Sequence, residues 1–185
     1  MPIFRSVSHA LHVAYLIDSL PASQRGPLQI MIEAHMRALG IWDTQARSTS
    51  VQFGRLAPLE VRAQCSMIIG AVRSRLPGPE RDAVQARYAH QVEKANGVAG
   101  VRNYAQPMLS LQDARATLAA AWSIYVDRKH RRDLSIRAIA EEYKLSPAAV
   151  GRDVKRIRHT GESLEKQAID RLAELFVAHE IAEAA

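Results

Sequence analysis

The chain has 185 residues, a length that suits one domain, or one domain with a small appended module, and that can bury a core without covalent staples. Its single cysteine excludes an intrachain disulfide and argues against a thiolate zinc site, and no apolar run is long enough to span a bilayer. The N-terminal segment contains Asp18 and lacks a small-residue cleavage site. We therefore expect no signal peptide, no membrane partner and a cytoplasmic location.

The net charge of +6 is concentrated in one part of the sequence. Between Arg128 and Thr160 there are ten Lys and Arg residues and four acids, whereas the rest of the chain carries 15 cations and 15 acids. A basic field confined to one segment predicts a polyanionic partner for that segment.

In chain order, the helical spacing of apolar residues predicts helices over residues 5–20, 28–39 and 58–76. Residues 41–54, between the second and third of these helices, are rich in Ser and Thr and are expected to form a loop. The third helix has an apolar stripe that makes Cys65 a small buried hydrophobe rather than a reactive thiol. The stripe consists of Val61, Cys65, Ile68, Ile69 and Val72.

The next helix is expected over residues 80–95, and the glycines of NGVAGV, residues 96–101, are expected to end it. Its inner face is expected to carry Val84, Tyr88 and Val92. Residues 113–129 are Ala-rich, and this segment has the highest intrinsic helix propensity in the chain. No stretch shows the alternation of period two that is typical of strands, so the expected fold class is all-α.

The final segment, residues 162–182, is amphipathic with roughly heptad spacing. It can close the core of the protein, or it can pair with a second copy as a homodimer helix. The expected organisation is a helical N-terminal body (residues 1–110), a helix-turn-helix DNA-binding module (111–160) and a C-terminal packing or dimerisation helix (161–185).

The stretch LSIRAIAEEYKLSPAAVGRDVKRIRH, residues 134–159, has the pattern of a helix-turn-helix. The first helix is expected over 136–143 and the second from Pro147 to about Arg158, with Ser146 as its N-cap. Lys144 stands at the turn position that glycine commonly takes, which carries a modest cost if that residue is left-handed. The residues expected to face inward are Ile139, Ala140, Tyr143, Leu145, Val150, Val154 and Ile157.

The remaining side chains of the second helix are candidates for DNA contact. Small Ala148 and Ala149, with Gly151, would let the helix lie deep in the major groove, where Arg152 can contact a guanine edge with two hydrogen bonds. The cations beyond Arg152, and those of the preceding RKHRR run, suit phosphates. The predicted DNA-binding residues are Ser146, Ala148, Ala149, Arg152, Lys155, Arg156, Arg158, His159, Arg128, Lys129, Arg131 and Arg132.

SIRAIAEEYKLSPAAVGRDVKRI, residues 135–157, resembles the helix-turn-helix of the last conserved region of bacterial sigma factors. LPGPERDAVQARYA, residues 76–89, also looks like the helix that precedes this motif in sigma factors. Here some 45 residues separate the two parts, where sigma factors have only a few. Either the upstream match is chance, or a helical insertion splits the module.

In size and order of elements the chain is also similar to the Q-type late-gene antiterminators of proteobacterial phages and prophages. These are mostly helical proteins that bind a promoter-proximal DNA site and load onto RNA polymerase. The resemblance implies double-stranded DNA and RNA polymerase as partners. The cysteine zinc site that some of them carry is excluded by the single cysteine of this chain.

The sequence has no Gly-rich phosphate loop, nucleophile elbow or HExxH motif, and the pair His9 and His12 lacks a third ligand nearby. We therefore expect no enzyme activity, no metal and no cofactor, although an enzyme that needs none of these features stays open. Two other hypotheses remain. One is a dimeric repressor or DNA-packaging adaptor, and the other is a helical scaffold whose basic face binds an acidic protein.

Overall fold

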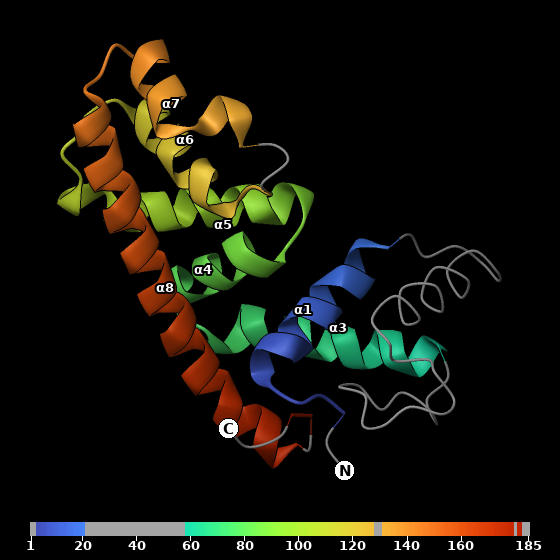
Figure 1. Ribbon diagram of the computed structural model, residues 1–185. Coiled ribbons are helices and arrows are strands. Elements are labelled where there is room, and N and C mark those ends of the chain that lie inside the picture. The colour runs from blue at the N-terminus through green and yellow to red at the C-terminus, as the bar shows by residue number, and fades with distance from the viewer. Residues whose placement is uncertain (1–2, 21–57, 128–130, 180, 183–185) are drawn as a thin grey trace. The chain divides into compact units, whose positions relative to one another are not determined.

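The computed structural model describes residues 3–20, 58–127, 131–179 and 181–182. These residues form an all-α fold, as the sequence predicts, with an isolated bridge between Phe4 and Ala182 and no strand in the described part. The predicted helix over 28–39 and the loop over 41–54 lie outside the described residues. The helices are α1 (Val7–Ser19), α3 (Pro58–Arg75), α4 (Gly78–Tyr88), α5 (Gln91–Ala105), α6 (Ala114–Tyr125), α7 (Ile136–Glu142) and α8 (Pro147–Ala178) (Figure 1).

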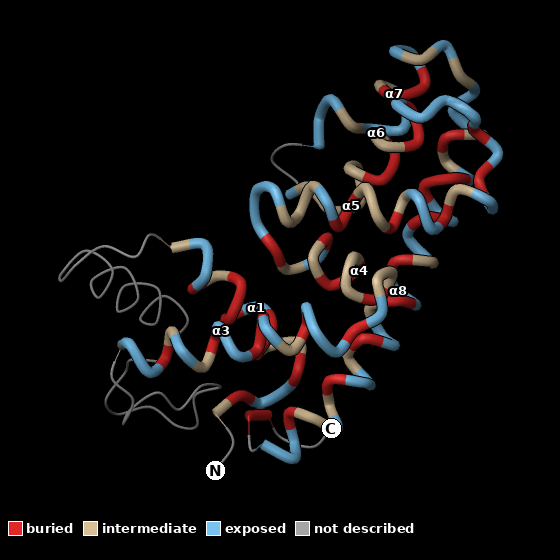
Figure 2. The backbone as a smooth tube through the Cα atoms, turned by 180° about the vertical axis from the view of Figure 1, so that it is seen from behind, coloured by how far each residue is buried: buried red, intermediate tan, exposed pale blue. Residues whose placement is uncertain are grey.

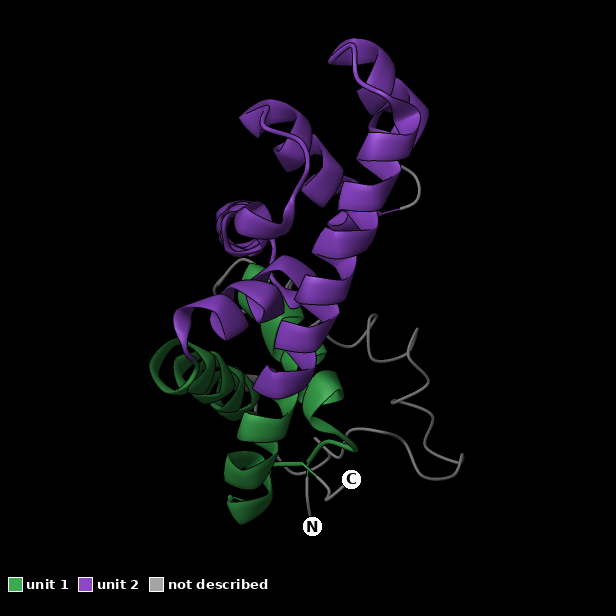
Figure 3. Cartoon of the chain, turned by 90° about the vertical axis from the view of Figure 1, so that its left-hand side faces the viewer, with its two compact units in different colours: residues 1–76, 169–185 green, residues 77–168 purple. Residues whose placement is uncertain are grey.

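Buried residues recur at helical spacing along the helices, with exposed residues between them (Figure 2). Each helix therefore has one buried face. The chain divides into two compact units, which Figure 3 shows in two colours. Unit 1 comprises residues 1–76 and 169–185, and unit 2 comprises residues 77–168. These bounds differ from the three segments expected from the sequence, because α4 and α5 share one hydrophobic core with α6, α7 and the first part of α8.

In unit 1, α1 packs against α3. The Ser6 side chain caps α1 by accepting a hydrogen bond from the backbone N–H of His9 at 3.2 Å. The backbone N–H of Phe4 donates to the carbonyl of Ile181 at 2.9 Å, which places the segment before α1 beside the segment after α8. Phe4, before α1, and Phe176, near the end of α8, are both buried, so each contributes a buried aromatic ring to unit 1.

The apolar stripe predicted for α3 is confirmed, since all five of its residues are buried. Burial raises the pKa of the Cys65 thiol to about 12, an effect that nearby Asp18 strengthens and Arg62 opposes. At neutral pH the thiol is therefore protonated, and the protonated form is a poor nucleophile.

We expect Cys65 in the native protein to resist an aromatic disulfide reagent at pH 7.5. Unfolding the chain in guanidinium removes the burial, so one thiol per chain should then react within minutes, as measured by release of the coloured thiolate. Rapid reaction of the native protein at that pH would contradict the burial of Cys65.

Unit 2 begins with the closely packed pair α4 and α5. The glycines that were expected to end a helix at residue 95 lie inside α5, and that expectation was wrong. A Cβ at Gly97 would lie 2.6 Å from the backbone carbonyl oxygen of Asp82 in α4, so only glycine permits this approach of the two helices. The helix expected over 80–95 instead breaks at Ala89 and His90, and Val92, predicted to be buried, is 71% exposed.

Helix α6 lies where the sequence predicts its strongest helix, although it ends at Tyr125 rather than Lys129. The Asp113 carboxylate caps it by accepting the N–H groups of Arg115 and Ala116 at 2.7 and 3.0 Å. Its buried side chains are small, which lets neighbouring helices approach closely. They are Ala116, Thr117, Ala120 and Ala121.

Helix α8 is one continuous helix of 32 residues, so the expected end near Arg158 and the separate final helix were wrong. Gly161, inside this helix, is buried, and the Tyr125 hydroxyl lies where its Cβ would be. Packing against α6 therefore explains a glycine in this helix. The heptad residues expected to close the core or form a dimer lie inside the units: Leu164 belongs to the core of unit 2, and Leu172 is buried in the part of α8 that belongs to unit 1.

No helix in the described part of the chain has both the length and the apolarity needed to cross a bilayer.

Candidate nucleic-acid interface

Helices α7 and α8 lie where the sequence predicts the two helices of the motif, and a tight turn joins them. The Ser135 hydroxyl caps α7 by accepting the N–H of Ala138 at 3.2 Å. At the other end, the N–H of Leu145 donates to the carbonyl of Ala140 at 2.8 Å, and the N–H of Lys144 donates to that of Glu141 at 3.3 Å. These two bonds form the helix ending known as a Schellman motif.

Lys144 has a φ of 55°, which is the left-handed conformation that the Schellman motif requires at this position. As expected from the sequence, a lysine therefore occupies the left-handed turn position that glycine commonly takes. A lysine in this conformation costs roughly 1 kcal/mol relative to glycine.

The inner faces of the two helices join the core of unit 2. Ile139 and Ala140 of α7 are buried, as are Val150, Val154 and Ile157 of α8, and all five were predicted to face inward. The other two predicted inner residues, Tyr143 and Leu145, are partly buried against the same core. The orientation of both helices about their own axes is thus fixed by apolar packing.

The outer face of α8 carries the cations. Ser146 and Ala148 are exposed at its start, and a group that we call the basic face is exposed beyond them. The helical spacing of Ala148, Arg152, Lys155 and His159 places these residues along one side of α8. Ala149, which was expected on the same side, is half-buried against the core. The basic face consists of Arg152, Lys155, Arg156, Arg158 and His159.

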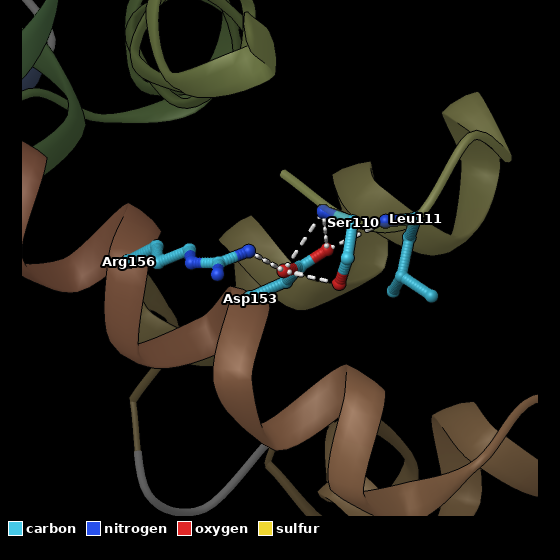
Figure 4. A network of polar contacts seen from close by, with 4 residues as sticks. All are labelled: Ser110, Leu111, Asp153 and Arg156. Carbon is cyan, nitrogen blue, oxygen red and sulfur yellow. Dashed lines mark hydrogen bonds and ion pairs between the residues drawn. The ribbon is translucent and has the colours of Figure 1, made fainter. Parts of the chain in front are cut away.

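Asp153, on the buried side of α8 next to Arg156, is fully buried and accepts hydrogen bonds from a neighbouring loop (Figure 4). The N–H groups of Ser110 and Leu111 donate to it at 2.9 and 2.8 Å, and the Ser110 hydroxyl donates at 2.9 Å. Arg156 also donates to it at 3.2 Å, while its side chain stays 47% exposed. Asp153 therefore holds α8 against the segment that leads into α6, and it orients one arginine of the basic face.

Burial acts to raise the pKa of the Asp153 carboxyl, but the donors from Leu111 and Ser110, together with Arg156, outweigh burial and hold the pKa below its ordinary value. Asp153 is therefore ionised at neutral pH. Its negative charge is satisfied by four donors, and its ion pair with Arg156 offsets one positive charge of the basic face.

The RKHRR run before the helix pair is only partly described. Arg128 and Lys129 lie outside the described residues. Arg131 donates to the carbonyls of Val126 and Ile124 at 2.8 and 3.0 Å, and these are carbonyls at the end of α6. A cation there also complements the negative end of the helix dipole, so Arg131 has a structural role that the sequence analysis missed. Arg132 is exposed.

Asp153 and Ser110 were not among the predicted site residues. A signal for Asp153 was present in the sequence, because it stands three residues after Val150 and four before Ile157, on the apolar side of the helix. An acid at a core-facing position needs buried donors. The sequence gives no indication that Ser110 and Leu111, more than 40 residues away, supply them.

No protein-family model matches the chain, and no curated protein is similar to it in sequence. Hypotheses about its function therefore depend on the residues described above.

Proposed function

We propose that this protein binds double-stranded DNA through α7 and α8, with α8 as the recognition helix in the major groove, and that it regulates transcription. The observation that carries the proposal is the division of the first part of α8 into two faces. One face is apolar and buried in the core, and the other presents exposed cations beside a tight turn.

The chemistry of the basic face suits duplex DNA. A single helix fits the major groove, and the small, exposed Ala148 near the helix start permits close approach to the bases. Arg152 is the candidate for a guanine edge, whereas Lys155 and Arg158 are candidates for phosphates. Arg156 keeps other guanidinium N–H groups for a phosphate while one nitrogen donates to Asp153.

The resemblance of residues 135–157 to sigma-factor helices, and of the whole chain to Q-type antiterminators, extends the proposal. On this hypothesis the protein acts in the cytoplasm at a promoter-proximal site and contacts RNA polymerase. Selection of bound sites from random duplexes tests this extension. A single asymmetric site supports it, whereas a palindrome supports the alternative of a dimeric repressor.

The proposal predicts salt-dependent duplex binding, measured by gel shift or fluorescence anisotropy over a series of salt concentrations. Each neutralised phosphate should contribute about −0.9 to the slope of log K against log salt. Absence of binding to any duplex at low salt, or binding that does not weaken as salt rises, would contradict the proposal and favour the scaffold hypothesis.

Two substitutions should separate base contact from phosphate contact. Arg152→Ala is expected to weaken the selected site by about 1–3 kcal/mol and to relax its sequence preference. Lys155→Ala should weaken all duplexes alike and reduce the salt slope by about one phosphate. The exposed arginine Arg75, at the end of α3, offers a matched control, because Arg75→Ala removes a cation far from the motif in sequence. Equal losses in all three variants would show a general charge effect and no specific interface.

A further inference from the structure

The turn between α7 and α8 contains a side chain that the fold does not require. Lys144 adopts the left-handed conformation that glycine reaches without steric cost. Both hydrogen bonds that close the turn are donated by backbone N–H groups, those of Lys144 and Leu145. The Lys144 side chain takes part in neither bond, so glycine would form the same turn with less strain.

Lys144 is also exposed, and only two residues separate it from Pro147, the first residue of α8. Its flexible stem ends in a compact ammonium with three N–H donors, which suits a phosphate and carries no preference for a base. A strained residue, kept where an unstrained one would fold equally well, points to a role for its side chain outside the fold.

Building on the proposed DNA binding, we propose that Lys144 contacts a backbone phosphate of the duplex, so that the interface includes the turn as well as the basic face of α8. The contact fixes the position of α8 on the duplex and adds affinity without adding sequence preference. Lys144 thus lowers folding stability through its strain and raises the affinity for the duplex through its charge.

Three variants at this position test the proposal. Lys144→Gly removes both the strain and the charge. It should raise the melting temperature by about 2–4 °C, lower duplex affinity about five- to tenfold near 0.1 M salt, and reduce the salt slope by about one phosphate. Lys144→Gln keeps the strain and loses the charge, so it should show the same binding defect without the gain in melting temperature. Lys144→Arg should retain most of the binding.

Lys166 provides a matched control, because it is an exposed lysine on α8 in unit 2 but lies beyond the basic face. Lys166→Ala removes the same charge and should leave the salt slope unchanged. If Lys144→Gly and Lys144→Gln bind as Lys166→Ala does, the Lys144 contact is wrong while DNA binding stands. A fall in melting temperature for Lys144→Gly would overturn the premise of strain. If the unaltered protein binds no duplex, both this inference and the proposed function fail.

Discussion

Replacing Asp153 by Ala is expected to lower the free energy of unfolding of unit 2 by about 2–4 kcal/mol. The substitution leaves the N–H groups of Ser110 and Leu111 without their acceptor, and Leu111 is buried, so water cannot readily replace the carboxylate. Urea unfolding followed by circular dichroism measures the loss. The exposed residue Asp170 on the same helix serves as control, and Asp170→Ala should change stability by no more than about 0.5 kcal/mol.

The same carboxylate should make unit 2 sensitive to acid. Because its pKa is lower in the folded protein than in the unfolded chain, the stabilisation is fully present above the unfolded value of about 3.9 and is lost as pH falls through the folded value. The difference in unfolding free energy between the unaltered protein and Asp153→Asn should therefore hold steady from about pH 6 to about pH 5 and shrink as pH falls further to about 3. A difference that stays constant down to about pH 3 would show that the fold does not lower the pKa of Asp153.

Replacing Gly97 by Ala should destabilise unit 2 by about 2–3 kcal/mol, although alanine favours helix formation by about 1 kcal/mol. The added Cβ would press on backbone atoms of α4, including the Asp82 carbonyl oxygen at 2.6 Å, and a backbone cannot rotate away as a side chain can. The helices α4 and α5 must therefore separate, which weakens the packing around Val98 and Val101.

Gly70 is the matched control for this substitution, because it is an exposed glycine inside α3 and a Cβ added there would have no described atom within 4 Å. Gly70→Ala should stabilise the protein by about 1 kcal/mol. Thermal melts of the two variants should consequently shift in opposite directions. A stabilised Gly97→Ala protein would mean that α4 and α5 do not approach each other as described.

Much of the all-α fold could be predicted from the sequence, because apolar residues at helical spacing identify helices without knowledge of their neighbours. The stripe of α3 and the start of α8 at Pro147 depend on such local signals. The glycines of residues 96–101 gave a wrong helix end because their role is not local. Gly97 lies inside α5 where the backbone of α4 approaches closely, and helix propensity alone indicates a break there.

In the candidate interface, too, features set by local sequence could be predicted, whereas contacts between distant elements could not. The buried and exposed faces of α8 could be predicted from the spacing of Val150, Val154 and Ile157. The hydrogen bonds of Arg131 and Arg156 could not, since they depend on where the end of α6 and the Asp153 carboxylate lie in the folded unit. Cations that look equivalent in sequence thus divide into those with structural contacts and those that only face outward.

The course of the chain through the two units also sets an order of folding during synthesis. Unit 2 is continuous in sequence, so its core is complete once Ala168 has left the ribosome. Unit 1 needs residues from both before and after unit 2, and Phe4 cannot pair with Ile181 until that residue has been made. Helices α1 and α3 can pack against each other early, but the part of unit 1 that residues 169–185 complete stays unfinished while the more than ninety residues of unit 2 are translated. An unfinished unit 1 exposes apolar surface in the nascent chain, and such surface is the kind that chaperones bind.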